Sequence, residues 1–506
     1  MSDPAEKKEG APAGAPRPYE PPRGATTSLR IAAGGRELPL TVHADWVVLR
    51  KEEEPVAEVF HVAYLLDGAP AEGRPITFVF NGGPGASSAY LHLGALGPRR
   101  VAFDESGAVL PPPARLVDNE ESWLAFTDLV FVDPVGTGFS RIVDRKQGAP
   151  GEGAAGDGKG GKNEFYHLNR DLDSLGELIQ RFLSRHHRWL SPVFIAGESY
   201  GGFRVGKLSR RLQEGFGVGL SGAILISPAL EWTQLVPTDY EVQHFVDAFP
   251  TMVAAAHFHR RCRGLAGDLP LGDVLRAAEE FATGELTRLL VQGERGDGDA
   301  RTAALERGAA LLGLPVELLH ATGGRIRIER FARELLRDRC EVIGLYDATA
   351  TAFDPYPGRE TGQGPDPTLF VIERVFTAGI NALLRATLEL ATERDYRLIS
   401  LEVNKAWALD TEQHVFERHV GATDDLRYAM SLNPHMKVLI SHGLYDLVTP
   451  YHASDRLVGH MQLPAPLRAN LTIRHFPGGH MFYTWDRSRA EFRDTAAAFV
   501  ASATGA

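Results

Sequence analysis

The stretch from Ser191 to Gly202, SPVFIAGESYGG, constrains the fold of this chain more than any other. It contains a short apolar run, residues 193–196, that is too short for a buried helix and rich in strand-forming residues. The pattern Gly-x-Ser-x-Gly around Ser199 follows at once, and residues 203–212 then carry helix-compatible side chains. The sequence therefore predicts a strand, a sharp turn and a helix, with Ser199 at the turn.

A serine on a sharp turn between a strand and a helix is typical of the nucleophile elbow of an α/β-hydrolase. Glycines flank such a serine because Cβ atoms there would collide with the neighbouring strand and helix. A chance glycine-serine loop is the alternative interpretation, and the flanking strand and helix patterns count against it. We therefore expect an α/β-hydrolase fold with a mostly parallel central sheet and with Ser199 as the nucleophile.

Composition bounds the class of protein. The 506 residues are 43% hydrophobic and 24% charged, which is ordinary for a globular protein with a large core. The net charge of −11 leaves no basic excess to neutralise phosphates, so we expect no nucleic acid partner. No apolar run is long enough to cross a bilayer, and the N-terminal residues lack the apolar stretch of a secretory signal. We therefore expect a cytoplasmic protein with no membrane partner, unless the sequence omits a leader.

Cysteine usage points to the same compartment. The chain has two cysteines, Cys262 and Cys340, and no C-x-x-C pair, a pattern that suits a reducing environment better than a disulfide scaffold. A single bridge between these two residues is the alternative. The acidic stretch 293–299 lacks the spacing of an EF-hand, so we interpret it as a solvated loop rather than a calcium site. We expect neither a metal nor a cofactor.

The order of the predicted elements indicates four regions. Residues 1–28 are rich in Pro, Ala, Gly and Lys and predict a disordered tail. Residues 29–230 begin with a predicted antiparallel hairpin and then alternate strand and helix patterns around a flexible glycine-rich loop at 148–162, which predicts the first part of the hydrolase core. Residues 231–431 carry mainly amphipathic helix patterns, and we expect an inserted helical cap over the active-site end. Strand patterns return in residues 432–506, which we expect to complete the core.

The catalytic partners of the serine follow from strand order. A serine hydroxyl needs a base to take its proton, and the base needs an acid to orient it. In α/β-hydrolases the acid and the base follow the serine in sequence, each just after a strand. Asp446 follows the strand pattern at 436–441, and His480 follows the one at 470–476. The order Ser199, Asp446, His480 therefore predicts the catalytic triad.

Other histidines and acids compete for these roles. His442 and His475 lie close to the same strand patterns but fit the loop position after a strand less well than His480 does. Asp455 is a rival acid, but it lies in a predicted helix, so Asp446 is preferred.

A glycine-rich loop, Asn81 to Gly85, follows the apolar strand pattern at 76–80. Its glycines allow the backbone to approach a ligand closely and to direct N–H groups at it. An ordinary strand-to-helix turn is the alternative, but in a hydrolase the loop at this place contributes one donor of the oxyanion hole. We expect the backbone amides of Gly83 and Tyr200 to form that hole.

Taken together, these motifs resemble the serine carboxypeptidase family. The resemblance rests on NGGPG at 81–85, DPVGTGFS at 133–140, GESYGG at 197–202 and the segments around Asp446 and His480. It covers most of the chain after the tail and is closest to the bacterial branch of the family.

The resemblance implies removal of the C-terminal residue from a peptide through an acyl-enzyme. It assigns the triad to Ser199, Asp446 and His480, and the oxyanion amides to Gly83 and Tyr200.

The resemblance also implies a binding site for the substrate's terminal carboxylate at Asn81, Gly82 and Glu198. Glu198 can donate a hydrogen bond to a carboxylate only when it is protonated. Two neighbouring carboxyl groups favour sharing a proton, so such a site works best at acidic pH. A structural acid that supports the elbow is the alternative role of Glu198.

The chain departs from the eukaryotic members of the family near these motifs. Ala95 stands where those members carry a second carboxylate-binding Glu, Val79 replaces a Trp, and Ala86 replaces a disulfide cysteine. Ala86 agrees with a reducing compartment. Ala95 weakens the expectation of strict carboxylate recognition.

We therefore expect a serine carboxypeptidase-like hydrolase that acts on a peptide or a small acyl substrate. An esterase or acyltransferase with the same triad is the alternative, because this fold hosts many acyl-transfer reactions. A binding protein without catalysis is a third interpretation, which an intact triad disfavours. The sequence leaves the oligomeric state open, with a homodimer among the possibilities.

Overall fold

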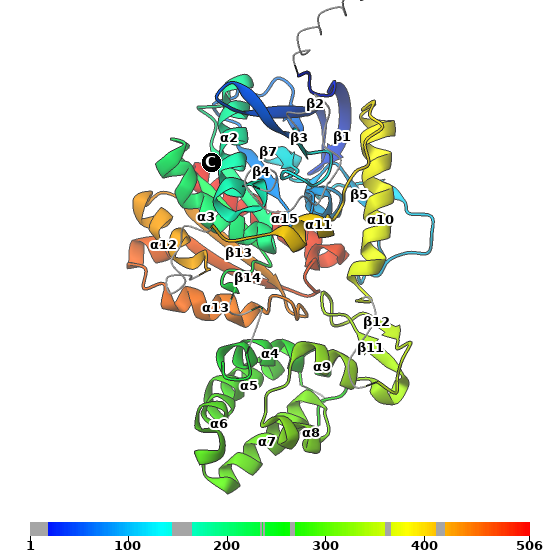
Figure 1. Cartoon of the computed structure of the whole chain (residues 1–506), viewed down its shortest axis with the longest axis vertical. Helices are drawn as coiled ribbons and strands as arrows, with labels where there is room; N and C mark the ends of the chain where they lie inside the picture. The colour runs from blue at the N-terminus through cyan, green and yellow to red at the C-terminus, as the bar shows by residue number, and fades with distance from the viewer. Residues whose placement is uncertain are drawn as a thin grey trace, which may run out of the picture.

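The computed structural model describes residues 19–143, 164–232, 235, 238–263, 269–359, 366–410 and 420–505. Within these residues, ten strands form one central sheet (Figure 1). The path across the sheet is β1 (Ala25–Ala33), β2 (Arg36–Lys51), β3 (Glu54–Leu66), β7 (Asp128–Val132), β4 (Ile76–Phe80), β9 (Val193–Glu198), β10 (Gly222–Ile226), β13 (Lys437–Gly443) and β14 (Leu471–Phe476), with β8 (Arg141–Ile142) beside β3.

Strand direction divides the sheet into two parts. From β7 through β4, β9, β10 and β13 to β14, every neighbouring pair is parallel. β1, β2, β3 and β7 pair antiparallel, with β2 and β3 as the predicted hairpin. β4, β7, β9 and β10 are buried along their whole length, as expected for strands covered on both faces. The predicted α/β-hydrolase fold is confirmed.

Helices cover the two faces of the sheet through separate apolar clusters. One cluster joins the sheet to α2 (Leu168–Arg185), α3 (Tyr200–Gly215), α12 (Thr423–Leu432) and α13 (Tyr451–His460). The other joins it to α1 (Ala89–Leu91), α10 (Leu369–Ala382) and α15 (Asp486–Thr504). Shorter elements include β5 (Arg99–Val101) and β6 (Leu116–Asp118), which pair with each other, and α11 (Leu401–Ala406) and α14 (Ala465–Arg468).

A helical lobe lies beyond the β13 and β14 side of the sheet (Figure 1). It consists of α4 (Gln243–Phe258), α5 (Leu271–Phe281), α6 (Thr287–Gln292), α7 (Gly298–Leu312), α8 (Val316–Thr322) and α9 (Ile328–Glu334), with the small hairpin of β11 (Glu341–Ile343) and β12 (Thr351–Phe353) at its side. The lobe has its own apolar cluster, which also contains Tyr445 and Leu447 from the loop after β13. Its core therefore reaches the loop that carries Asp446.

Several element boundaries differ from the sequence-based expectation. β1 pairs with β2 from Ala25 onward, so residues 25–28 are strand rather than tail. β13 extends to Gly443 and includes His442, two residues beyond the predicted strand end. α4 was not predicted, because it is buried around its whole circumference and contains Pro250, so it shows no amphipathic stripe. The first 18 residues and the glycine-rich loop at 148–162 lie outside the described residues.

Two smaller expectations concern cysteines and charge. Cys262 and Cys340 are free thiols, so the alternative of a bridge between them is not realised.

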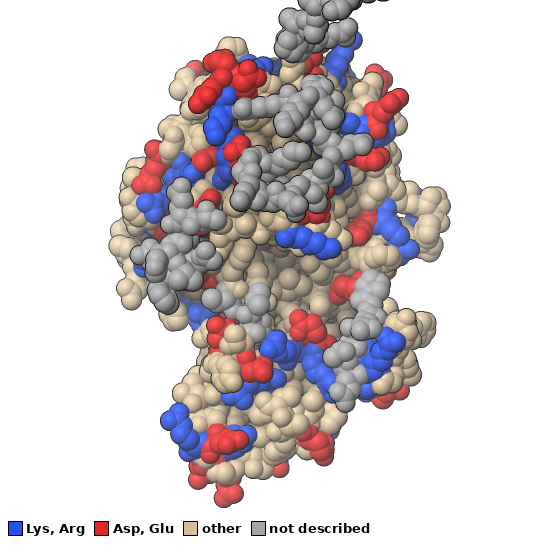
Figure 2. All heavy atoms as spheres, viewed as in Figure 1, with Lys and Arg blue, Asp and Glu red and all other residues tan. Residues whose placement is uncertain are grey.

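Asp297 of the acidic loop caps α7, with its side chain accepting from the Ala300 amide at 2.9 Å. Basic and acidic side chains are interspersed on the face shown in Figure 2. Every helix in the described part of the chain is too short or too polar to cross a bilayer.

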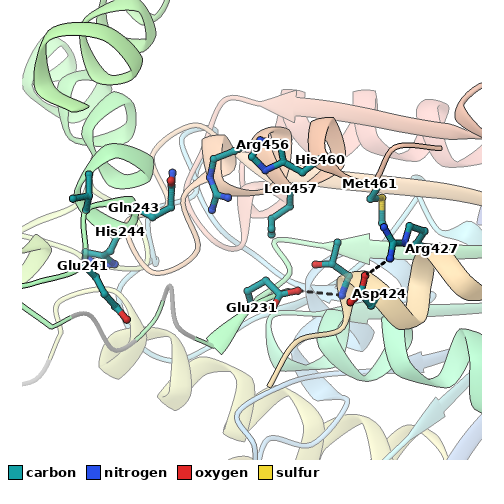
Figure 3. Close-up of a pocket in the computed structure, with 12 residues that line it drawn as sticks. Glu231, Glu241, Gln243, His244, Asp424, Arg427, Arg456, Leu457, His460 and Met461 are labelled. Atoms are coloured by element: carbon teal, nitrogen blue, oxygen red, sulfur yellow. Dashed lines mark hydrogen bonds and ion pairs between the residues drawn. The ribbon is translucent and has the colours of Figure 1, made fainter. Parts of the chain in front are cut away.

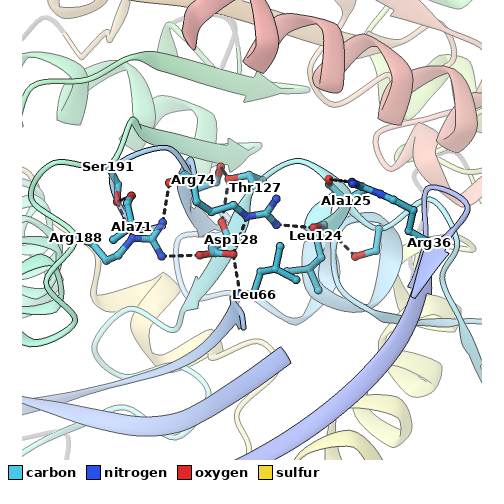
Figure 4. Close-up of polar contacts among 12 residues, drawn as sticks. Arg36, Leu66, Ala71, Arg74, Leu124, Ala125, Thr127, Asp128, Arg188 and Ser191 are labelled. Carbon is cyan, nitrogen blue, oxygen red and sulfur yellow. Dashed lines mark hydrogen bonds and ion pairs between the residues drawn. The ribbon is translucent and has the colours of Figure 1, made fainter. Parts of the chain in front are cut away.

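A buried ion network around Asp128 joins the amino ends of the central strands (Figure 4). The Asp128 carboxylate lies 2.5 Å from the Arg188 guanidinium and 3.0 Å from that of Arg74, and it accepts the Leu66 amide at 3.0 Å. Arg188 also donates to the Arg74 carbonyl and to Ser191, which precede β4 and β9. The network therefore connects β3, β4, β7 and β9 at the end of the sheet where β4, β7 and β9 begin, opposite to the elbow.

Asp128→Ala should destabilise the protein strongly, because it leaves the buried guanidinium of Arg188 and the partly buried one of Arg74 without their carboxylate. Breaking a buried pair in this way costs about 3–5 kcal/mol, which we expect as a lower denaturation midpoint in urea followed by circular dichroism. Glu491→Ala, which removes an exposed pair with Arg487, is the control and should leave the midpoint unchanged. An unchanged midpoint for Asp128→Ala would show that the network does not stabilise the sheet.

Candidate active site

Ser199 occupies the turn between the end of β9 and the start of α3, as predicted. Its backbone is strained, with φ 60° and ψ −125°, in a region that residues other than glycine rarely adopt. A Cβ on Gly197 would lie 2.2 Å from the Gly201 carbonyl oxygen, and one on Gly201 would lie 2.7 Å from that of Phe80. These two glycines are required because backbone segments meet at the elbow with no room for a side chain.

Asp446 and His480 follow β13 and β14 and form a buried pair. The Asp446 Oδ2 lies 2.7 Å from the His480 Nδ1. The Asp446 Oδ1 accepts the amides of Val448 and Thr449 at 2.9 and 3.0 Å. The Thr449 hydroxyl donates to Oδ2 at 2.6 Å and lies 3.1 Å from the His480 Nδ1. The acid is therefore fixed by three donors besides the imidazole, which sets the orientation of the ring.

The electrostatics of this pair suit a general base. Burial by itself would raise the pKa of Asp446, but the charge of His480 and the hydrogen bonds outweigh it and hold that pKa below its usual value. Burial would lower the pKa of His480, but the Asp446 carboxylate, with a smaller effect of Glu198, raises it above its usual value. The imidazole can therefore take up a proton readily while Asp446 stays ionised.

The elbow and the His480 loop lie at the same end of the sheet, where its parallel strands terminate. β9, β10, β13 and β14 are consecutive neighbours. The Ser227 hydroxyl, just after β10, donates to the His480 carbonyl at 2.8 Å, and the Ala229 amide donates to the Ser199 carbonyl at 3.2 Å. Among the described residues, neither the Ser199 Oγ nor the His480 Nε2 has a hydrogen-bond partner. Catalytic hydrogen bonds are often long before substrate binds, so the contact between these two atoms stays a prediction.

The rival residues make other contacts. His442 is buried in β13 with its Nε2 2.8 Å from the Ser454 hydroxyl, and burial lowers its pKa to about 4. The His475 Nε2 lies 3.1 Å from Asp455, so these two residues pair with each other. Neither arrangement resembles the acid and base at the ends of β13 and β14.

The glycine-rich loop after β4 passes directly over the elbow. A Cβ on Gly82 would lie 2.6 Å from the Tyr200 amide nitrogen and 3.0 Å from the Ser199 Cβ. Gly83 is exposed and has φ +101°, a conformation that favours glycine. Within the described residues, the amides of Gly83 and Tyr200 donate to no other protein group. These amides are therefore open to an oxyanion, and their joint role stays a prediction.

Two neighbouring segments hold this loop in place. The Asp133 carboxylate accepts the amide and the hydroxyl of Ser88 at 2.9 and 2.8 Å. The Ser400 amide, before α11, donates to the Gly85 carbonyl at 2.8 Å. The loop is thus fixed from the motif at 133–140 and from the segment that returns from the helical lobe.

Glu198, directly before the nucleophile, is almost fully buried between two donors. The Asn81 amide donates to the Glu198 Oε2 at 2.6 Å, and the Tyr483 hydroxyl donates to Oε1 at 2.7 Å. The Leu91 amide donates to the Asn81 Oδ1 at 3.0 Å, so the Nδ2 group must face Glu198. Burial raises the pKa of Glu198 to about 7, against the opposing effects of His480 and the two hydrogen bonds. This carboxyl group can therefore be neutral or ionised near neutral pH.

The segment between β11 and β12 contacts the loops that carry Asp446 and His480. The Tyr346 carbonyl accepts the His480 amide at 2.5 Å, and the Tyr346 ring lies edge-on to the imidazole at 5.3 Å. The Leu447 amide donates to the Leu345 carbonyl at 3.0 Å, next to Asp446. Residues 345–348 therefore form a wall beside the acid and the base.

Sequence reasoning did not predict Thr449, Tyr483 or Tyr346. Thr449 and Tyr483 each lie three residues beyond a predicted triad residue, and a donor at that spacing was the available signal. Tyr346 is far from the triad residues in sequence and carries no local motif, so only the folded chain reveals it.

A cavity of about 490 Å³ lies between α4, α12 and α13 (Figure 3). None of the predicted catalytic or binding residues lines it. Its lining contains both acidic and basic side chains and consists of Glu231, Glu241, Val242, Gln243, His244, Thr423, Asp424, Arg427, Arg456, Leu457, His460 and Met461.

Comparison of the sequence with known proteins finds the same family that the motifs resemble. Residues 36–247 match the family described as serine carboxypeptidase. This match covers less than half of the 506 residues. It is 26% identical to serine carboxypeptidase-like 5 of Arabidopsis thaliana over 257 residues, 48% of this chain and 52% of that protein. It is 33% identical to the pheromone-processing carboxypeptidase KEX1 of Yarrowia lipolytica over 178 residues, 33% of this chain and 25% of that protein.

These matches cover about half of the first relative and a quarter of the second. The crystal structure of KEX1, a prohormone-processing carboxypeptidase from Saccharomyces cerevisiae, aligns with a TM-score of 0.52 and 14% sequence identity over 91% of each chain. At that identity the likeness supports the fold alone.

A fluorophosphonate should label the protein at Ser199, because the probe reacts with a serine that an adjacent base activates. Ser199→Ala should abolish labelling, as measured by mass spectrometry of the digested protein. Ser431→Ala, at an exposed position on α12, is the control and should label like the wild type. Labelling of folded Ser199→Ala at the wild-type rate would remove Ser199 as the nucleophile.

The labelling rate should fall as pH is lowered through the raised pKa of His480, because only the neutral imidazole can accept the serine proton. Asp446→Asn removes the charge that raises this pKa, so the acid limb should move to lower pH. The rate at neutral pH should also fall, on the order of 10⁴-fold, as for loss of a triad acid. Asp455→Asn, the rival acid, is the control, and a limb that moves with it instead would contradict the assignment.

Proposed function

We propose that this protein is a serine carboxypeptidase, which hydrolyses the last peptide bond of a chain and releases the C-terminal residue. The observation that carries this proposal is the buried pair of Asn81 and Glu198 beside Ser199. An exopeptidase must hold a free carboxylate next to the carbonyl that it attacks. Glu198 immediately precedes the nucleophile, and Asn81 begins the loop that crosses the elbow, so both lie where that carboxylate would be.

The first half of the reaction forms an acyl-enzyme. The Ser199 oxygen attacks the peptide carbonyl carbon, and the His480 Nε2 takes the serine proton. Asp446 stays ionised and stabilises the resulting imidazolium through its 2.7 Å contact with Nδ1. The carbonyl oxygen becomes an oxyanion, which the amides of Gly83 and Tyr200 stabilise. When the carbon–nitrogen bond breaks, the imidazolium gives its proton to the departing amine.

The second half returns the enzyme to its starting state. Water attacks the acyl carbon while His480 takes one of its protons, and the same two amides stabilise the new oxyanion. The bond to the Ser199 oxygen then breaks, and the serine regains its proton from His480. One peptide bond and one water molecule are consumed, and the shortened peptide and the free C-terminal residue leave.

Recognition of the terminal carboxylate uses the donors around Glu198. The Asn81 amide group gives one hydrogen to Glu198 and keeps a second for the substrate. Gly82 has no side chain to obstruct the approach over the elbow. Glu198 must be protonated to donate to a carboxylate, and its pKa of about 7 keeps that form populated at neutral and mildly acidic pH. Binding of a peptide acid should therefore weaken as pH rises above this value.

We also propose the division of the chain into a hydrolase core, residues 29–230 and 432–506, and an insertion, residues 231–431, in which the helical lobe forms the cap while α10 and α12 pack against the sheet. The contacts of residues 345–348 with the loops of Asp446 and His480 support this division. The cap would then contribute the walls that select substrate side chains.

Three further points belong to the proposal. The free thiols of Cys262 and Cys340 are compatible with a reducing compartment such as the cytoplasm. Ala86 and Ala95, which differ from the eukaryotic pattern, favour the bacterial branch of the family. An esterase or acyltransferase with the same triad is tested by the comparison of substrates that follows.

Asn81→Ala and Glu198→Gln should lower kcat/KM far more for a blocked dipeptide acid than for its methyl ester. A hydrogen bond to a charged group contributes about 1.5–3 kcal/mol, so each variant should lose roughly 10- to 100-fold on the acid alone. Glu214→Gln, an exposed carboxyl on α3, is the control and should change neither substrate. Equal losses on acid and ester would remove carboxylate recognition and favour the esterase alternative.

A further inference from the structure

Tyr483 contacts Glu198, and the function proposed above assigns no role to this tyrosine. It lies on a short 3₁₀ turn, η11 (Phe482–Thr484), directly after the His480 loop, and its side chain is fully buried. Its hydroxyl donates to the Glu198 Oε1 at 2.7 Å. A buried tyrosine hydroxyl needs a partner, and here the partner is the carboxyl group that precedes the nucleophile.

The sequence opposite Tyr483 leaves space for its ring. A Cβ on Gly94 would lie 2.4 Å from the Tyr483 Cε2, so the ring can lie where it does because residue 94 is glycine. Gly94 and Ala95 belong to the π-helix η1 (His92–Leu96). The resemblance to the serine carboxypeptidase family implies a second carboxylate-binding Glu at the position of Ala95 in eukaryotic members of the family. Neither Gly94 nor Ala95 has a polar side chain, so this turn offers Glu198 no hydrogen bond, and Tyr483 provides one from the facing turn.

A tyrosine and a carboxyl group differ as partners of Glu198. A second carboxyl group can share a proton with Glu198 or, when ionised, repel it. Burial holds the pKa of Tyr483 well above its usual value, so its hydroxyl keeps its proton and acts as a donor. The Asn81 amide is also fixed as a donor by its contact with the Leu91 amide. A proton on Glu198 is therefore directed away from both partners and toward any ligand at the elbow.

We propose that Tyr483 is a positioning residue for Glu198, and that its hydroxyl takes the place of the family's second carboxyl group in holding Glu198 against the substrate's terminal carboxylate. This inference rests on the carboxypeptidase function proposed above. It explains how a chain with Ala95 can retain recognition of a free C-terminus.

The charges around Glu198 set the expected effect of removing the hydroxyl. Burial raises the pKa of Glu198, and the hydrogen bonds of Tyr483 and Asn81 lower it. Loss of the Tyr483 hydroxyl should therefore raise this pKa further. The other ionisable groups that act on Glu198, or on which it acts, are His480, Asp446, Tyr90 and Tyr346.

Tyr483→Phe keeps the ring and removes only the hydroxyl, so it isolates the proposed contact. We expect the alkaline limb of kcat/KM for the blocked dipeptide acid to move up by about one pH unit, which corresponds to one hydrogen bond to a charged group. KM for the acid should rise roughly tenfold with little change in kcat, and the profile for the methyl ester should not move. Tyr428→Phe, at an exposed position on α12, is the control and should leave all profiles unchanged.

A double variant tests whether Tyr483 acts through Glu198. Adding Tyr483→Phe to Glu198→Gln should cause little further loss on the acid, because the group that the hydroxyl positions is already altered. Additive losses, or equal changes on acid and ester, would make Tyr483 a structural residue and overturn the proposal. Fluorophosphonate labelling at the wild-type rate shows that each variant is folded with an intact triad.

The same data separate this inference from the proposed function. If Glu198→Gln loses acid hydrolysis selectively while Tyr483→Phe leaves the alkaline limb in place, the role of Tyr483 is wrong and the carboxypeptidase function stands. If the wild type hydrolyses the ester but not the acid, both are wrong.

Discussion

The strained turn at Ser199 is the constraint on which the rest of the site depends. A non-glycine residue at φ 60° costs roughly 1–3 kcal/mol, and it persists only where its surroundings determine it. Here the Ser199 amide donates to the Ile226 carbonyl at 2.9 Å, and its carbonyl accepts the Gly202 amide at 2.9 Å. The glycines on either side allow β4, β9 and α3 to meet within contact distance. Packing among β4, β9 and α3 therefore keeps Ser199 in its strained conformation at the end of β9.

Three buried carboxyl groups around this turn have different electrostatic environments and hence different uses. Asp446 receives three donors and an imidazole, so it stays ionised and orients the base. Glu198 receives two neutral donors, and burial raises its pKa to about 7, so its proton can be given or withheld. Burial also raises the pKa of Asp133, to about 6, while its hydrogen bonds with Ser88 hold the glycine-rich loop. The same functional group therefore has three different protonation and hydrogen-bonding environments because its neighbours differ.

The parts of this structure that sequence could predict are those with local signals. The buried strands, the elbow and the order Ser199, Asp446, His480 follow from apolar runs, glycines and strand ends. The structure contains the strands and the turn at Ser199 and places Asp446 beside His480, while the catalytic triad stays a prediction. The sequence did not predict α4, because a helix that is buried on all sides lacks the alternation of apolar and polar faces that marks an amphipathic helix. Tyr483 was not predicted because its spacing from His480 does not show that its hydroxyl contacts Glu198, and that contact needs the space left by Gly94.

The helical lobe contacts the loops of Asp446 and His480 through backbone hydrogen bonds. The Tyr346 carbonyl holds the His480 amide, and the Leu345 carbonyl holds the Leu447 amide beside Asp446. These contacts depend on where the 345–348 segment lies and not on the identity of its side chains. Because the lobe's apolar core includes Tyr445 and Leu447, a shift of the lobe would displace the acid loop together with the wall beside the base. A lobe joined in this way can vary the side chains of its outer helices while the loops of Asp446 and His480 keep these backbone contacts.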